Sequence, residues 1–227
     1  MAKTFFVTGT DTEVGKTFVT RALMRAARQA GKKVRGYKPV ASGCDWVEGE
    51  LKNSDALGLQ AESSIPLPYA MHNPYAFAPA IAPHIAAREA SELISIPRIG
   101  EGLARLKETA ADWIFVEGAG GWRLPLDERH FLSDWVKKEH LPVILVVGAR
   151  LGCINHALLT LEAIRHDGLV VAGWVLNRVD PQMSHYQDNA NTLKQLISAP
   201  LLGEIPWLEE GGAEAVDSFV DLSPLLK

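Results

Sequence analysis

The sequence has little of what stabilises small secreted proteins or anchors a chain in a membrane. It contains only two cysteines, Cys44 and Cys153, and no Cys-x-x-Cys pair, so neither a disulfide framework nor a structural zinc site is predicted. No stretch approaches the ~20 apolar residues needed to span a bilayer. The first residues, MAKTFFVTGTD, lack the pattern of a signal peptide. We therefore expect a cytoplasmic protein with no membrane partner.

Clustered positive charge is also lacking. The chain has 23 Lys and Arg against 27 Asp and Glu, a net charge of −4, and no long basic run. Because nucleic-acid affinity comes mainly from clustered Lys and Arg that neutralise phosphates, we expect no nucleic-acid partner. A hydrophobic content of 47% and a charged content of 22% are typical of a globular protein and exclude a disordered or collagen-like chain. The length favours one domain over residues 1–227.

Short, almost wholly apolar runs recur along the chain, separated by segments with helical periodicity. The clearest runs are residues 5–7, 113–116, 143–147 and 170–176. Continuous apolar character is typical of parallel strands that are covered on both faces. Helices are predicted at residues 17–30, 155–166 and 184–197. The alternation predicts an α/β fold with a doubly wound, mostly parallel sheet of about six or seven strands flanked by helices.

Residues 62–84 depart from this alternation. Five prolines fall in this segment, at positions 66, 68, 74, 79 and 83. Proline cannot donate to a sheet ladder and is confined to edges and turns. We expect this segment to form an ordered excursion over one edge of the sheet.

The strongest functional signal is the turn Gly-Thr-Asp-Thr-Glu-Val-Gly-Lys-Thr at residues 9–17, between the first strand and the first helix. The N–H groups of such a turn and the positive end of the helix bind phosphate oxygens. Lys16 is expected to contact the β- and γ-phosphates, and the Thr17 hydroxyl to bind Mg²⁺. Gly9 and Gly15 enclose five residues, one more than the usual spacing. The turn predicts a nucleotide-binding site of the P-loop NTPase type.

Two carboxylates and a second lysine are candidates for the same site. Glu117 ends the run 113–116, precedes Gly-Ala-Gly-Gly, and is a candidate for the magnesium shell. Asp55 follows a helix start capped by Asn53 or Ser54, where a carboxylate favours the helix dipole even without a catalytic role. Lys38 falls near the end of a second strand over residues 34–40. From the residues alone Asp55 is more simply structural, and Lys38 is either merely exposed or functional.

The turn from Gly152 to Asn155 lies between a predicted strand and a predicted helix. Its free N–H groups form a potential anion site, although an ordinary helix start explains the pattern equally well. The seven histidines are scattered and form no i,i+4 pair, so a histidine-based zinc site is not expected.

Taken together, these segments form a recognisable set. They are residues 9–17, 36–43 (GYKPVASG), 53–57 (NSDAL), 83–86 (PHIA), 116–122 (VEGAGGW), 151–157 (LGCINHA) and 203–208 (GEIPWL). In this order they resemble the dethiobiotin synthetase family over nearly the whole chain. The lengthened P-loop is itself a trait of that family.

The resemblance implies an activity. The family closes the ureido ring of dethiobiotin from 7,8-diaminononanoate and CO₂, with ATP and Mg²⁺. One amine carries CO₂ as a carbamate, a carbamate oxygen attacks the γ-phosphate, and the second amine displaces phosphate from the mixed anhydride. The resemblance also implies a homodimer with active sites at the subunit interface.

The resemblance assigns roles to individual residues as well. The catalytic residues would be Lys38, Lys16 and Thr12, and the metal ligands Thr17, Asp55 and Glu117. The nucleotide would contact Glu13, Val14, Gly15, Lys16, Thr17, Phe18, Asp55, Glu117, Gly118, Ala119, Gly120, Asn177, Arg178, Pro206, Trp207 and Leu208. The substrate would contact Thr12, Lys38, Ser42 and, across the dimer, Gly152, Cys153, Ile154 and Asn155.

A nucleotide-switch ATPase that partitions or positions other molecules is the alternative hypothesis. Such proteins carry an extra lysine early in the P-loop, which reaches the nucleotide of the partner subunit. Here that position is Asp11, and no lysine lies between Lys3 and Lys16. The sequence therefore favours the ligase.

Overall fold

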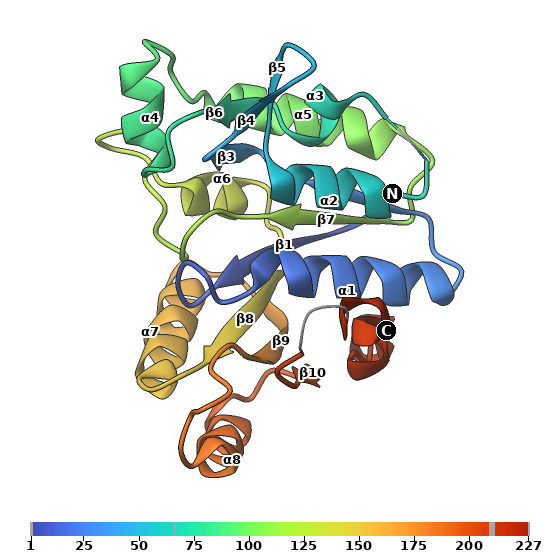
Figure 1. Ribbon diagram of the computed structural model, residues 1–227, viewed down its shortest axis with the longest axis vertical. Helices are drawn as coiled ribbons and strands as arrows, with labels where there is room; N and C mark the ends of the chain where they lie inside the picture. Colours follow the sequence, from blue (N-terminus) through green and yellow to red (C-terminus); the bar gives the residue numbers. More distant parts are fainter. Residues whose placement is uncertain (1, 66, 209–211, 227) are drawn as a thin grey trace.

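Six parallel strands form the central sheet of the computed structural model, which describes residues 2–65, 67–208 and 212–226 (Figure 1). In spatial order the strands are β10 (Leu201–Ile205), β9 (Val171–Arg178), β8 (Val143–Ala149), β1 (Lys3–Gly9), β7 (Trp113–Glu117) and β2 (Val34–Tyr37). Every neighbouring pair is parallel. The predicted α/β fold is confirmed.

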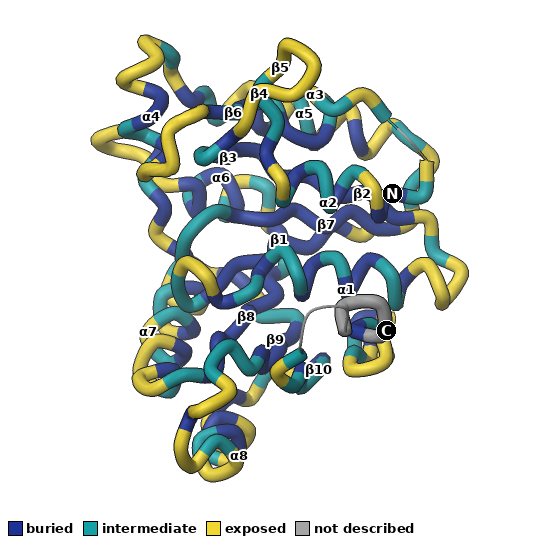
Figure 2. The backbone as a smooth tube through the Cα atoms, viewed as in Figure 1, coloured by how far each residue is buried: buried dark blue, intermediate teal, exposed yellow. Residues whose placement is uncertain are grey.

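The apolar runs lie inside this sheet, as expected. All residues of β7 and β8 are buried, and in β1 only Lys3 is exposed. Figure 2 shows these strands as the buried centre of the molecule. Neighbouring side chains in β1 point to opposite faces, since Phe5 and Val7 pack in one core cluster and Phe6 in another. Apolar residues are therefore needed at successive positions because both faces are covered.

Helices cover the two faces of the sheet. On one face lie α1 (Lys16–Gln29), α2 (Ser54–Glu62) and the 3-10 helices η1 (Gly212–Phe219) and η2 (Ser223–Leu225). On the other lie α5 (Ile96–Glu108), α6 (Leu132–Lys138), α7 (Cys153–His166) and α8 (Tyr186–Leu196), and α4 (Pro83–Glu89) lies apart from the central sheet (Figure 1). Among the described residues, no helix has both the length and the apolar character to cross a membrane.

The predicted helices occur with small shifts at their ends. Helix α1 spans residues 16–29 and is followed by Gly31 at φ 76°, the left-handed conformation expected of a C-terminal glycine. Helix α7 begins at Cys153, two residues before the predicted start, because Gly152 at φ 92° allows the chain to turn into the helix there. Helix α8 covers residues 186–196 of the predicted 184–197.

The predicted second strand over residues 34–40 is wrong in one respect, because it is two strands. Strand β2 ends at Tyr37, and the Lys38 N–H donates to the His72 carbonyl at 2.8 Å instead of to the central sheet. After Pro39, the strand β3 (Val40–Ser42) pairs with β6 (Tyr75–Phe77) in a separate sheet. Proline has no N–H for the ladder, so the chain leaves the sheet at this point. Lys38 is thereby placed at the sheet's carboxyl edge.

The proline-rich segment is an ordered excursion, as predicted. Its described part contains α3 (Tyr69–His72) and β6 and leads into α4. These elements lie beyond β2, which is labelled in Figure 2, together with a hairpin of β4 (Asp45–Val47) and β5 (Glu50–Lys52). The excursion contacts the chain just after β2, where the Lys38 N–H donates to the His72 carbonyl, at the edge of the sheet where ligands bind in such folds.

Candidate active site

The P-loop connects the end of β1 to the start of α1, and Val14 anchors it. Its side chain is fully buried and lies against Gly9 and Gly148, where added Cβ atoms would come within 2.6 and 2.8 Å of it. Any larger residue at either position would displace the loop. Gly148 lies in β8, far from the motif in sequence, and no sequence pattern indicated its role.

Asn177 holds the other end of the P-loop. It is buried at the end of β9, and its side-chain Nδ2 donates to the Val14 carbonyl at 3.0 Å. Gly15, the residue after Val14, has φ 81°, and a Cβ at position 15 would collide with the Asn177 side-chain amide. Glycine is thus required at position 15 for its conformation and for its space.

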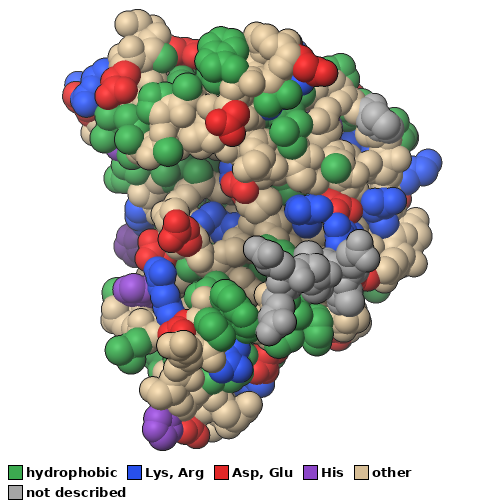
Figure 3. Space-filling model, viewed as in Figure 1, with side chains coloured by type: hydrophobic (Ala, Val, Ile, Leu, Met, Phe, Trp, Pro, Cys, Tyr) green, Lys and Arg blue, Asp and Glu red, His purple; other side chains and the backbone are tan. Residues whose placement is uncertain are grey.

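A cavity of about 440 Å³ opens beside the P-loop at the carboxyl edge of the sheet. It is lined by Thr12, Glu13, Gly15, Lys16, Thr17, Phe18, Lys38, Ala41, Ser42, Asn53, Asp55, Ala119 and Gly120. All of these except Ala41 and Asn53 are predicted site residues, so segments far apart in sequence meet here. Figure 3 shows side chains of both charge signs lying close together across the middle of the molecule.

Lys38 joins two carboxylates within this site. Its Nζ lies 2.6 Å from Glu117 Oε1 and 2.8 Å from Asp55 Oδ2. The Lys38 side chain is 5% exposed and that of Glu117 is 0% exposed. The Thr17 hydroxyl donates to the same Oε1 of Glu117 at 2.7 Å. The four side chains form one connected network between α1, α2 and the ends of β2 and β7.

The charges of this network stabilise one another. Burial alone would lower the pKa of Lys38, but the charges of Glu117 and Asp55 outweigh it, and the pKa is raised. For Asp55, burial acts to raise the pKa, yet Lys38 outweighs it and the pKa is lowered. Lys38 therefore stays a cation and Asp55 an anion at neutral pH.

Lys16 behaves differently because it lacks a close carboxylate. Its Nζ donates to the backbone carbonyl of Asp11 at 2.9 Å. Burial lowers its pKa to about 8, and the charge of Glu117 opposes this only in part. A bound polyphosphate would act as the anionic partner of Lys16 and would raise its pKa.

The oxygen atoms around Thr17 fit a magnesium ion. Glu117 Oε2 is buried and has no hydrogen-bond partner among the residues that the structure describes. The Thr17 hydroxyl and the Asp55 carboxylate lie in the same network. Mg²⁺ prefers hard oxygen ligands and is usually bound by one or two carboxylates together with substrate phosphates.

Asn53 connects two parts of the site, a function that the sequence indicated only in part. As predicted it caps α2, since its Oδ1 accepts from the N–H groups of Asp55 at 3.1 Å and Ala56 at 3.3 Å. Its Nδ2 also donates to the Ser42 carbonyl at 3.3 Å. The Asn53 side chain thus joins the start of α2, which carries Asp55, to β3, which carries Ser42.

The remaining predicted residues do not line the cavity. Arg178 places its guanidinium 4.7 Å from the ring centre of Tyr186, and Trp207, which follows β10, is 47% exposed. Val14, Glu117, Gly118 and Asn177 are not among the lining residues, although Glu117 and Asn177 are hydrogen-bonded to the site and to the P-loop. The turn from Gly152 to Asn155 lies at the start of α7. The ligand roles predicted for these residues stay predictions.

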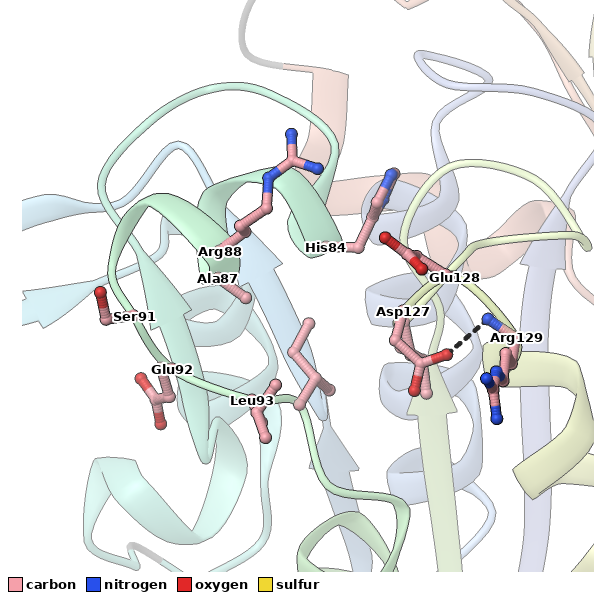
Figure 4. A pocket seen from close by; sticks show the side chains of 11 residues that line it. His84, Ala87, Arg88, Ser91, Glu92, Leu93, Asp127, Glu128 and Arg129 are labelled. Carbon is pink, nitrogen blue, oxygen red and sulfur yellow. Dashed lines mark hydrogen bonds between the residues drawn. The ribbon is translucent and has the colours of Figure 1, made fainter.

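A second cavity, of about 500 Å³, lies between α4 and the loop that follows β7 (Figure 4). Its walls carry His84, Arg88 and Glu92 on one side and Asp127 on the other, where Asp127 Oδ1 accepts from the Arg129 N–H at 2.7 Å. No residue predicted to bind a ligand lines this cavity, so it is separate from the P-loop site.

The parallel sheet, the P-loop at the end of β1 and the acidic residue at the end of β7 define a P-loop nucleotide-binding protein. Solved structures share the fold. A ParA family ATPase from Chlorobium tepidum has a TM-score of 0.58 at 16% identity, covering 99% of this chain and 93% of that one. The MinD cell division protein of Aquifex aeolicus has a TM-score of 0.53 at 17% identity, covering 97% and 88%.

Sequence comparison narrows the class to one family. Residues 3–215 match a family model described as an AAA domain. The chain is 53% identical over 226 residues to the ATP-dependent dethiobiotin synthetase of Aeromonas hydrophila, covering 100% of both. It is also 53% identical to dethiobiotin synthetase 1 of Escherichia coli O157:H7, covering 99% of this chain and 100% of the relative. The chain belongs to the ATP-dependent dethiobiotin synthetase family, which confirms the resemblance found in the sequence.

Proposed function

We propose that this chain is a carbon–nitrogen ligase that forms dethiobiotin, ADP and phosphate from 7,8-diaminononanoate, CO₂ and ATP. The observation that carries the proposal is the network of Lys38, Asp55, Glu117 and Thr17 beside the P-loop, in a chain of this family. This network combines a permanent cation with oxygen ligands for a metal at one end of a phosphate-binding turn.

The residues divide the work of phosphoryl transfer between them. Lys16 and the N–H groups of residues 13–17 hold the β- and γ-phosphates. Thr17, Asp55 and Glu117 would hold Mg²⁺, which would neutralise charge on the phosphate oxygens. Lys38 lies where it can stabilise the carbamate and the transferred phosphoryl group. Such chemistry depends mainly on positioning and charge neutralisation.

The bonds formed and broken balance without a further reactant. One amine adds to CO₂ and loses a proton, which gives a carbamate. A carbamate oxygen attacks the γ-phosphorus and ADP leaves with the bridging oxygen. The second amine then attacks the carbamate carbon, loses a proton and displaces inorganic phosphate, which takes up that proton, and the ring closes. Thr12 and Ser42 line the cavity, and in this proposal they orient the diamine.

We further propose that the protein is a cytoplasmic homodimer and that each subunit is a single domain. In this dimer the turn from Gly152 to Asn155 of one subunit contacts the substrate bound by the other. Leu151, in the turn before α7, is 92% exposed, and Leu159, on α7, is 57% exposed. Large apolar side chains exposed together favour a protein interface. In the same proposal, Asn177, Arg178 and residues 206–208 surround the adenine.

The proposal is tested by the dependence of turnover on substrates. We expect purified protein to form ADP and a cyclic urea only when diaminononanoate and bicarbonate are both present. Product is followed by mass spectrometry and ADP by a coupled assay. Equal ATP hydrolysis with and without the diamine would reject the ligase and favour a nucleotide-switch ATPase.

A further inference from the structure

Asp11 places a negative charge inside the loop that should attract phosphates. Its Oδ1 accepts from the Thr12 N–H at 2.7 Å, and its backbone carbonyl accepts from Lys16 Nζ at 2.9 Å. Burial lowers the pKa of Lys16, and the negative charge of Asp11 acts in the opposite direction. An unpaired carboxylate here would repel a bound polyphosphate.

Arg150 neutralises this carboxylate. It directly follows β8, the strand beside β1, and its Nη2 forms an ion pair with Asp11 Oδ2. The two segments are joined by backbone as well, since the Thr10 N–H donates to the Val146 carbonyl at 3.0 Å. Arg150 is therefore held beside the loop by the sheet itself.

We propose that Arg150 is a positioning residue for nucleotide binding, which acts by neutralising and orienting the Asp11 carboxylate within the P-loop. The inference rests on the proposed function, because it requires a nucleotide at this loop. The pair is partly exposed, with the two side chains 36% and 47% accessible, and such pairs add little to folding stability. The pair instead affects the affinity for the nucleotide, because the phosphates of a bound nucleotide carry several negative charges and lie close to Asp11.

Calorimetric titration with Mg-ADP tests this inference through a double-mutant cycle. We expect Arg150→Gln to weaken binding by about five- to tenfold, because Asp11 is left unpaired. Arg150→Lys keeps the charge and should bind nearly as wild type does. Asp11→Asn should bind at least as tightly as wild type, and Asp11→Asn with Arg150→Gln should recover most of the loss. The loss should shrink at high salt.

Two results would contradict the role of Arg150, and a third would contradict the proposed function itself. If Arg150→Gln binds like wild type, or if the double variant is as weak as Arg150→Gln, the inference is wrong. If wild type itself binds no Mg-ADP, the proposed function fails together with the inference. Arg98→Gln is the matched control, since Arg98 pairs with Glu92 at 3.0 Å on the surface, and it should not change the affinity. Thermal unfolding confirms that each variant is folded, and we expect little change in its midpoint.

Discussion

At the scale of single residues, Lys38 is a case in which the structure settles whether a side chain is exposed or buried in a site. The sequence left open whether Lys38 is merely exposed, because a lysine before a proline at a strand end is common in either case. In the structure its Nζ lies between Glu117 and Asp55 at hydrogen-bond distance. Removing one partner of such a buried pair leaves an uncompensated charge, which commonly costs about 3–5 kcal/mol.

Replacing Lys38 with Met should therefore affect catalysis and stability together. We expect kcat to fall by at least about 100-fold, because a cation near the transferred group is lost. The free energy of unfolding should fall by about 3 kcal/mol, because Glu117 stays buried without its partner. Mg-ADP affinity should change only a few-fold, since Lys16 is intact.

Steady-state kinetics, urea unfolding and calorimetry measure the three quantities. Lys52→Met is the control, since Lys52 pairs at 3.1 Å with the exposed Glu48, and its loss should cost less than about 1 kcal/mol and no activity. Unchanged turnover in Lys38→Met would contradict a catalytic role. Unchanged stability would contradict the importance of the ion pair.

At the scale of elements, the start of α2 is where a local signal and a tertiary contact coincide. The residues Asn-Ser-Asp predict a helix start capped by Asn53 or Ser54, and in the structure the cap is Asn53. The sequence could not show that the same side chain binds the Ser42 carbonyl, because that contact depends on how β3 returns beside α2. The helix start thus orients Asp55 toward Lys38 as well as beginning a helix.

Asn53→Ala should weaken both the helix and the site. The lost cap should cost about 1 kcal/mol of unfolding free energy, and the Mg²⁺ concentration for half-maximal activity should rise several-fold because Asp55 is less well placed. Ser95→Ala is the matched control, because Ser95 caps α5 by accepting from the Arg98 N–H at 3.4 Å. The control should lose stability without a change in Mg²⁺ dependence. Equal Mg²⁺ dependence in both variants would show that the cap is structural only.

At the scale of the whole molecule, the proposed dimer depends on the turn at the start of α7. The turn from Gly152 to Asn155 does not line the P-loop cavity of its own chain. A second copy could bring that turn to the substrate, and the exposed Leu151 and Leu159 on the same segment favour this arrangement.

The double variant Leu151→Asp with Leu159→Asp should be monomeric. Charged residues in an apolar interface are costly to bury, so we expect the sedimentation coefficient to fall to that of one chain. Ligase activity should be lost because the site would be incomplete. Val170→Asp is the control, since Val170 is 69% exposed and precedes β9 at the opposite end of the sheet, and it should stay dimeric and active. A fully active monomer would exclude the shared site.

Most of the fold could be predicted because its signals are local. Continuous apolar runs indicated β1, β7, β8 and β9, since a strand covered on both faces must be apolar at every position. The P-loop was also readable, because its glycines, lysine and threonine lie within nine consecutive residues. The split of the predicted second strand into β2 and β3 was missed, because the pattern could not show that the chain changes sheets at Pro39.

Local patterns in the sequence were thus enough to predict β1, β7, β8 and β9, the phosphate-binding turn and the family of this protein. Only the tertiary structure decided that Thr17, Lys38, Asp55 and Glu117 form one network. These residues span a hundred positions, and they meet because β7 inserts between β1 and β2 in the sheet. Strand order depends on the packing of distant segments, so no local pattern could indicate it.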